Sequence, residues 1–274
     1  MNTKHERYDL VFSLGAACAC SVALRRAKLQ FASFPLDWLA LGTPLSRAKL
    51  VASHFEGWLE KDDFKYLGTN PVNGLGMFDN VRTGLKHLHD FADGPIEKSY
   101  DAVKAKYARR EARLYDLAEK SRRILCAYVS RPTVEPVPPE TLKEVRAILS
   151  QAFPCATVDI VHFANDSGRS LENRRSAEIG DGVFEIAFDY HDPDRDVAVD
   201  LVAAALVDEG FTARDYRSKE EKRTYELKKK MKKYGVTTRS ALLAARIKHN
   251  LRKMFGLAAE EKPDDGIRQG RTQP

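Results

Sequence analysis

Cys18 is the residue whose type and position point most directly to chemistry. It follows Leu14-Gly15-Ala16-Ala17, a short segment that joins an apolar run to a helical pattern. A thiol in the first turn of a helix lies beside unpaired backbone N–H groups and the positive end of the helix dipole, and both stabilise a thiolate. The thiolate is the nucleophilic form of cysteine. We therefore predict Cys18 as a catalytic nucleophile, the structural alternative being a small buried hydrophobic residue.

A catalytic cysteine needs a base, and the 7 histidines of the chain supply the candidates. His89 is followed directly by Asp90, in a segment, residues 84–91, that alternates like a strand. His162 lies at the end of an apolar run, where open α/β sheets place many of their site residues. His191 lies in a turn-like segment and is a further candidate.

A metal site is a second interpretation of the same histidines. His87, His89 and Asp90 are close in sequence, and His191 could join them. Nothing else in the chain completes a ligand set, and the spacing of Cys18 and Cys20 differs from the C-x-x-C pairs typical of structural zinc. The glycine-rich motifs that bind nucleotide phosphates are absent as well. We therefore predict no metal and no cofactor.

Apolar runs alternate with helical patterns along the first 210 residues, and 43% of the residues are hydrophobic. This pattern excludes a fully disordered chain and predicts an α/β fold with a mostly parallel sheet flanked by helices. We expect residues 54–83 to be irregular because glycine and proline punctuate them. The predicted strands are residues 8–15, 84–91, 124–129, 158–163 and 183–188, and the predicted helices are 18–28, 44–53, 96–121, 140–151 and 195–208.

Several short segments, taken in order, resemble a bacterial family classed as papain-like cysteine peptidases. The resemblance covers roughly residues 8–190 and includes an Arg-rich helix before a strand. The segments that carry it are Phe12-Ser13-Leu14-Gly15-Ala16-Ala17-Cys18, Leu24-Arg25, Phe34-Pro35-Leu36-Asp37-Trp38, His89-Asp90-Phe91 and Tyr107-Ala108-Arg109-Arg110 with Arg113-Leu114.

The resemblance implies a cysteine-dependent acyl hydrolase or transferase that acts on a peptide or another acyl substrate. Cys18 matches the nucleophile and His89 the base, with Asp90 beside it, and Asp37 falls in a matching segment where it could orient a partner. The Asn or Asp that such enzymes use as a third residue has no clear match in this chain.

A parallel sheet fits a second class of enzyme better than a papain-like fold does. This alternative is an esterase or transferase that modifies bacterial surface glycans on a doubly wound sheet. Its nucleophile would be Ser13 or Cys18, with His191 as a partner. A third alternative is a non-catalytic binding module, in which the turn before Cys18 only joins a strand to a helix.

The positive charge of the chain is concentrated near its C-terminal end. The net charge is +6 overall, but residues 212–254 contain 15 Lys and Arg against 4 Asp and Glu. We predict an α/β domain over residues 1–211, a basic helical extension over 212–257 and a disordered tail over 258–274.

The basic extension suggests a partner and a location. An anionic membrane surface or a protein is the expected partner of residues 212–254. We do not expect nucleic acid, because no named nucleic-acid-binding motif occurs there. We expect a cytoplasmic protein that is membrane-peripheral if the extension binds lipid, since the first residues show no apolar signal segment.

Overall fold

The computed structural model describes residues 7–132, 136–238, 240–243, 245 and 247. Contacts divide the chain into two units, Met1–Tyr216 and Arg217–Pro274. The division falls a few residues after the boundary predicted at 211, because residues 212–214 still pair with Tyr8 through backbone hydrogen bonds. The tail predicted over 258–274 lies outside the described residues.

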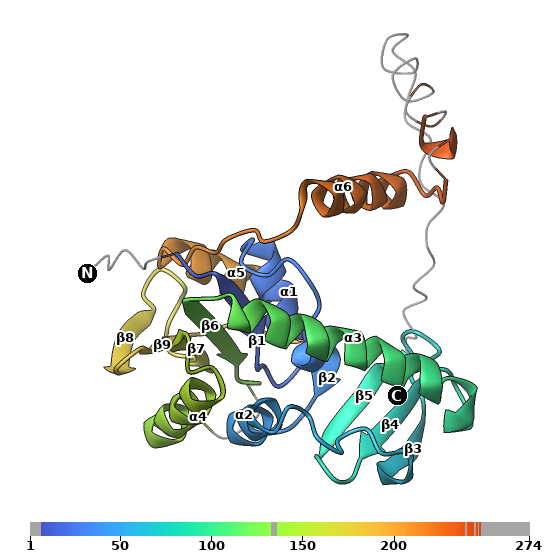
Figure 1. The fold of residues 1–274 in the computed structure, drawn as a ribbon. Helices are drawn as coiled ribbons and strands as arrows, with labels where there is room; N and C mark the ends of the chain where they lie inside the picture. Colours follow the sequence, from blue (N-terminus) through green and yellow to red (C-terminus); the bar gives the residue numbers. More distant parts are fainter. Residues whose placement is uncertain (1–6, 133–135, 239, 244, 246, 248–274) are drawn as a thin grey trace, which may run out of the picture. The chain divides into compact units, whose positions relative to one another are not determined.

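The first unit is built on a five-stranded sheet with the order β1-β6-β7-β9-β8. The first four strands in this order are parallel, and β8 is antiparallel to β9. The mostly parallel α/β sheet predicted from the sequence is therefore confirmed (Figure 1). The strands are β1 Leu10–Ser13, β6 Arg123–Val129, β7 Thr157–Asn165, β8 Arg175–Gly180 and β9 Val183–Phe188.

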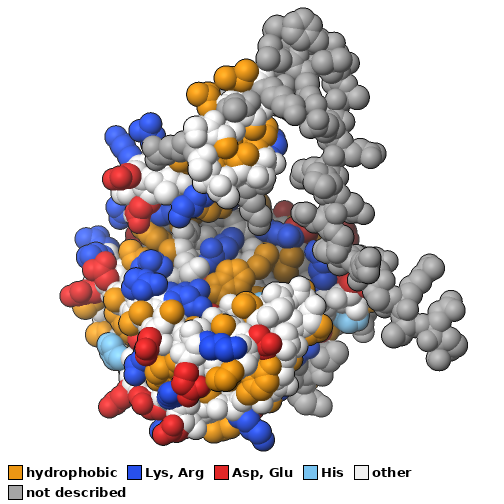
Figure 2. Space-filling model, turned by 90° about the vertical axis from the view of Figure 1, so that its right-hand side faces the viewer, with side chains coloured by type: hydrophobic (Ala, Val, Ile, Leu, Met, Phe, Trp, Pro, Cys, Tyr) orange, Lys and Arg blue, Asp and Glu red, His pale blue; other side chains and the backbone are white. Residues whose placement is uncertain are grey.

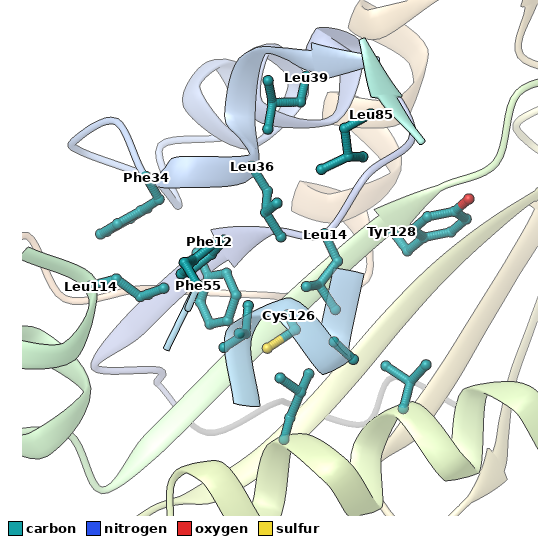
Figure 3. Packing of buried hydrophobic residues seen from close by; sticks show 14 of the residues in the cluster. Phe12, Leu14, Phe34, Leu36, Leu39, Phe55, Leu85, Leu114, Cys126 and Tyr128 are labelled. Atoms are coloured by element: carbon teal, nitrogen blue, oxygen red, sulfur yellow. The ribbon is translucent and has the colours of Figure 1, made fainter. Parts of the chain in front are cut away.

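Helices cover both faces of this sheet, which explains why its central strands are nearly continuous apolar runs. On one face α1 (Cys18–Arg26) and α5 (Val199–Asp208) share a hydrophobic cluster with the sheet. On the other face a larger cluster includes side chains of α2 (Pro44–Ala52), α3 (Tyr100–Glu119) and α4 (Pro139–Ala152). Tyr128 lies at the edge of that cluster (Figure 3).

A second, four-stranded antiparallel sheet is formed by one short strand before α2 and three strands between α2 and α3. Its order is β2-β5-β4-β3, so β3 is an edge strand. The expectation that residues 54–83 are irregular was wrong, because β3 and β4 both lie in this range. The strands are β2 Leu39–Ala40, β3 Phe64–Thr69, β4 Gly76–Asn80 and β5 Leu85–Phe91.

Short elements complete the first unit. Two pairing strands, β10 (His191–Asp192) and β11 (Asp196–Val197), precede α5 and were not predicted. Three 3-10 helices are η1 Pro35–Trp38, η2 Lys61–Asp63 and η3 Ile96–Lys98.

The second unit contains the helix α6, Lys219–Lys233, inside the range predicted as a basic helix. Beyond residue 238, the structure describes only residues 240–243, 245 and 247 of the extension predicted over 212–257. Among the residues that the structure describes, no helix combines the length and the apolar character needed to cross a membrane.

Candidate functional site

Cys18 is the first residue of α1, as the sequence predicted, and follows a tight turn after β1. The turn is held by Leu14 N–H, which donates to the carbonyl of Ala127, and by Gly15 N–H, which donates to Ser13 Oγ. The backbone N–H groups of Cys18 and Ala19 favour the thiolate, but burial is the larger effect and raises the pKa of Cys18 above its ordinary value. The thiol is therefore protonated near neutral pH.

His89 lies on β5, in the antiparallel sheet, and its side chain is exposed. Its Nδ1 accepts a hydrogen bond of 2.9 Å from the amide of Asn73. Among the described residues no hydrogen bond joins Cys18 to a histidine. The predicted Cys18–His89 pair stays a prediction.

Asp90 is the neighbour of His89 in sequence, but its side chain is 2% exposed and lies in the interior beside His87, whereas His89 is exposed, and the pairing of β5 with β4 is irregular at this point. There its Oδ2 accepts from His87 Nδ1 at 3.0 Å and from Tyr107 Oη at 2.6 Å, and its Oδ1 accepts from Lys106. Burial alone would raise the pKa of Asp90, but His87 and Lys106 hold it well below its ordinary value. Asp90 thus orients His87 and makes no hydrogen bond to His89.

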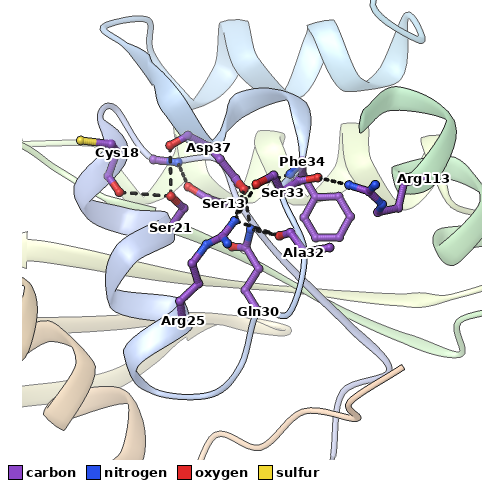
Figure 4. A network of polar contacts seen from close by, with 11 residues as sticks. Ser13, Cys18, Ser21, Arg25, Gln30, Ala32, Ser33, Phe34, Asp37 and Arg113 are labelled. Carbon is purple, nitrogen blue, oxygen red and sulfur yellow. Dashed lines mark hydrogen bonds and ion pairs between the residues drawn. The ribbon is translucent and has the colours of Figure 1, made fainter. Parts of the chain in front are cut away.

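Asp37 is fully buried at the corner between η1 and α1. Its Oδ2 accepts from Arg25 Nη2 at 3.0 Å, from Gln30 Nε2 at 2.6 Å and from the backbone N–H of Phe34 at 2.9 Å. Burial raises the pKa of Asp37 to about 6, against the opposing effect of Arg25. The Cys18 sulfur points away from this network (Figure 4).

Ser21 links the backbones on which Cys18 and Asp37 lie. Its Oγ is 3.1 Å from the carbonyl oxygens of both residues. The structure therefore brings Cys18 and Asp37 to one corner of the α/β unit through backbone contacts. His89 and Asp90 are neighbours on β5, but their side chains have different hydrogen-bond partners.

A complete chain of acid, imidazole and hydroxyl lies elsewhere, across the parallel strands β6, β7 and β9. Tyr128, His162 and Glu185 are in register on the neighbouring strands β6, β7 and β9. His162 Nε2 is 2.8 Å from Ser130 Oγ, and His162 Nδ1 is 3.2 Å from Glu185 Oε2. The side chain of His162 is only 1% exposed.

The partners of His162 determine where the neutral imidazole carries its proton. A carboxylate can only accept, so Nδ1 donates to Glu185 and Nε2 accepts from the Ser130 hydroxyl. The hydrogen bond from His162 lowers the pKa of Glu185, and Arg175, 2.6 Å from Oε1, adds to this effect. Glu185 is therefore ionised and holds the imidazole in the tautomer that can take a proton from serine.

Ser130 is fixed in place by its backbone directly after β6. Its N–H donates to the carbonyl of Phe163 at 3.1 Å, and its carbonyl accepts from Tyr190 Oη at 2.8 Å. Both contacts join Ser130 to the neighbouring parts of the sheet. The hydroxyl thus lies on a rigid support, as a positioned nucleophile requires.

A pocket of about 470 Å³ opens beside Ser130 at this edge of the sheet. His162 and Glu185 are not among the residues that line it, so they lie behind the serine. The lining comes from the end of β6, from the loops after β1, β2 and β6, and from the first turns of α2 and α4. It comprises Ala16, Leu41, Gly42, Thr43, Pro44, Leu45, Tyr128, Ser130, Arg131, Pro136, Val137, Pro138 and Thr141.

Arg47 places a buried positive charge beneath one wall of this pocket. It is 0% exposed and donates to the carbonyls of Leu36, Leu39 and Leu41. A Cβ added to Gly42, in the pocket wall, would lie 3.4 Å from Arg47 Nε. No carboxylate pairs with Arg47 among the described residues. Burial lowers its pKa to about 10, so the guanidinium is still charged at neutral pH.

His162 was a candidate from the sequence, whereas Ser130 and Glu185 were not predicted. Glu185 is a charged residue inside the apolar run Val183–Phe188, and Ser130 follows directly after another such run. The strand-end position could have indicated Ser130. For Glu185 the signal was a charged residue within an otherwise apolar strand. His191, the other candidate, is exposed on β10.

Comparison with known proteins does not assign this chain to a family. No family model, no curated protein and no solved structure matches this chain. No cluster of three His, Cys, Asp or Glu side chains within the described part of the chain could hold a metal ion.

Proposed function

We propose that this chain is an acyl hydrolase or acyltransferase in which Ser130 is the nucleophile. This is the esterase-type alternative drawn from the sequence, with a different serine and histidine. The observation that carries it is the hydrogen-bonded chain Ser130–His162–Glu185, whose serine lines a pocket. The same three roles, hydroxyl, imidazole and carboxylate, serve acyl transfer on unrelated folds.

The proposed reaction has two steps that use the same imidazole. His162 Nε2 takes the Ser130 proton while Oγ attacks the carbonyl carbon of an ester. The tetrahedral intermediate collapses when the bond to the leaving oxygen breaks, and His162 returns the proton to that oxygen. Water or the hydroxyl of an acceptor then attacks the acyl-serine by the reverse proton path, which frees Ser130.

One charge supports this chemistry directly. Glu185 stabilises the imidazolium that forms when His162 takes the proton, and Arg175 lies 2.6 Å from its other carboxylate oxygen.

The cysteine peptidase implied by the resemblance is a second candidate. It would use Cys18 as nucleophile and His89 as base, and the observation that favours it is the contact of the thiol with the first backbone N–H groups of α1. The opposing effect is burial, which raises the pKa of the same thiol. The two candidates differ in their nucleophile, so one set of variants separates them.

The test is the hydrolysis of p-nitrophenyl butyrate by the purified chain and by three variants. Ser130→Ala should lower kcat/KM by at least about 10³-fold, as expected when a nucleophile that acts in a triad is removed. Cys18→Ala and the exposed Ser53→Ala should both retain activity. A fluorophosphonate probe should label Ser130, which mass spectrometry detects without any knowledge of the natural substrate. Circular dichroism checks that each variant is folded.

Two outcomes would count against the serine. Loss of turnover in Cys18→Ala with full activity in Ser130→Ala would support the cysteine candidate. Absence of both probe labelling and ester hydrolysis in the folded wild-type chain would remove the proposed activity.

A further inference from the structure

The pocket beside Ser130 is apolar on most of its surface, and this limits the groups that can bind there. Aliphatic and proline side chains form the greater part of the lining, and Tyr128 adds an aromatic ring. Transfer of hydrocarbon from water to such a lining is favourable, whereas a charged group would lose its hydration without a partner in the lining. Arg47 does not supply that partner, because it lies beneath the lining and its guanidinium donates to the carbonyls of Leu36, Leu39 and Leu41.

The polar groups of the lining are largely engaged with the protein itself. Thr43 Oγ1 accepts from the backbone N–H of Ser46 and caps α2. Arg131 Nε lies 2.6 Å from Asp196 Oδ2, so its charge is already paired. Ser130 is then the polar group of the lining that is oriented for a reaction, because its hydroxyl donates to His162.

We infer that the substrate of this site carries an uncharged aliphatic acyl group longer than acetyl, seated in the pocket with its carbonyl at Ser130. This inference rests on the proposed function and names its substrate class. The volume of about 470 Å³ is far larger than an acetyl group needs and falls in the range of roughly 300–1,000 Å³ that small-molecule sites have. A longer chain therefore gains contacts that acetyl leaves unused.

The first arm of the experiment is a series of p-nitrophenyl esters with acetyl, butyryl, hexanoyl and octanoyl groups. Each added methylene that reaches the apolar lining should raise kcat/KM by about 4-fold until the pocket is full. The hemisuccinate ester has the same number of acyl carbons as the butyrate but ends in a carboxylate. It should be the poorer substrate of this pair.

The second arm narrows the pocket. Leu45 lines it from the first turn of α2, and Leu45→Trp should remove the preference for longer chains while acetyl hydrolysis is largely kept. Leu50→Trp lies on the same helix but outside the lining, and it is the matched control. It should leave the order of the esters unchanged.

The third arm measures binding without turnover. Ser130→Ala is titrated with 2-octanone, an uncharged probe, and with acetone, while NMR follows the protein signals. We expect saturable binding of 2-octanone that Leu45→Trp weakens at least 10-fold, and no saturable binding of acetone.

Together, the three arms of the experiment distinguish the serine mechanism of the proposed function from the substrate class inferred here. Ester hydrolysis with no dependence on chain length, or a preference for the hemisuccinate, overturns the inference and leaves the serine mechanism in place. Binding of 2-octanone in this pocket without any esterase activity supports the apolar acyl seat and rejects the proposed function. Absence of binding to a folded Ser130→Ala, together with equal rates for all esters, overturns the inference.

Discussion

The buried carboxylate of Asp37 makes the stability of the fold depend on pH. Its three hydrogen bonds all end on Oδ2, and they hold the helix α1 through Arg25 and the turn before η1 through Phe34. The cost of burying the charge is only partly offset by these contacts, because the pKa rises from 3.8 to about 6. The residue that the family resemblance marked as a site residue is therefore also a strong determinant of stability.

The raised pKa gives a prediction with a defined sign. A carboxyl whose folded-state pKa lies above its unfolded value stabilises the fold below the unfolded pKa, and this contribution is lost as pH rises through about 6. We expect Asp37→Asn to remove most of this pH dependence of the free energy of unfolding, which amounts to about 3 kcal/mol between pH 3 and pH 7. Urea unfolding of both proteins across this range measures it.

The control for Asp37→Asn is an exposed carboxylate. The side chain of Asp116 is 61% exposed and pairs with Lys120. Asp116→Asn should leave the pH dependence of unfolding as it is in the wild type. An unchanged slope in Asp37→Asn would contradict the assigned role of Asp37.

The cysteines give a second prediction for individual residues. Cys155 is exposed, Cys18 is half-buried, and Cys20 and Cys126 are buried. Because burial raises the pKa of Cys18 above 9.0, iodoacetamide at pH 7 should label Cys155 before Cys18. Peptide mass spectrometry of briefly labelled protein gives the order. Faster labelling of Cys18 would show a reactive thiolate and would favour the cysteine candidate.

The sequence located Cys18 correctly at a helix start but could not predict the surroundings of its sulfur. The local pattern determines the helix and its dipole, whereas burial depends on segments that are distant in the chain. The same limit applies to Ser130 and Glu185, which are 55 residues apart in the printed sequence and meet only through the sheet register. His162, between them, could be proposed from its strand end alone.

At the scale of elements, the turn between β1 and α1 depends on one glycine. A Cβ at Gly15 would lie 2.2 Å from Cys20 Cβ and 3.0 Å from its Sγ, and both atoms are part of a fully buried side chain. The helix cannot yield easily because Cys20 also donates to the carbonyl of Ala127 in the adjacent strand β6. A larger residue must therefore separate the helix from the sheet.

Gly15→Ala should destabilise the fold by at least about 2 kcal/mol, which is within the cost of overpacking a buried site. Chemical unfolding with circular dichroism measures the change. Gly168→Ala is the matched control, because its nearest atom would be Asp166 Oδ1 at 3.4 Å. We expect its effect to be within about 0.5 kcal/mol. Equal stability of Gly15→Ala and the wild type would rule out a close approach at this turn.

The elements that were predicted well share a strong local period. The strands β1, β6, β7 and β9 are apolar runs, and the helices between them carry apolar residues at helical spacing. The strands β3 and β4 were missed because glycines interrupt them and because β3 alternates weakly, with most of its residues exposed. The pairing of β4 with β5 and of β3 with β4 supplies the order that their own sequences do not specify.

At the scale of the whole molecule, the two units differ in charge. On the face shown in Figure 2, Lys and Arg side chains are interspersed with Asp and Glu. The helix α6 in the second unit has the sequence KEEKRTYELKKKMKK, which contains eight basic residues and three acidic ones. The basic character of the chain therefore has a local origin, as the charge count along the sequence indicated.

The charge of α6 leads to a prediction about membrane surfaces. Each basic residue near an anionic bilayer contributes about 1 kcal/mol, and salt screens this attraction. The chain should bind vesicles that contain phosphatidylserine in 50 mM salt, lose most of this binding in 500 mM salt and ignore neutral vesicles. Reversal of Lys228, Lys229 and Lys230 to glutamate should weaken the binding at least 10-fold in a sedimentation assay.

The comparison variant must change the total charge by the same amount without altering α6. Glutamate at Lys49, Lys65 and Lys104, three exposed positions of the first unit, meets this condition. If attraction depended only on net charge, both triple variants would lose affinity equally. Because surface potentials act within a Debye length of about 10 Å at 0.1 M salt, a loss confined to the α6 variant would assign the contact to that helix. Equal losses would instead assign it to the charge of the molecule as a whole.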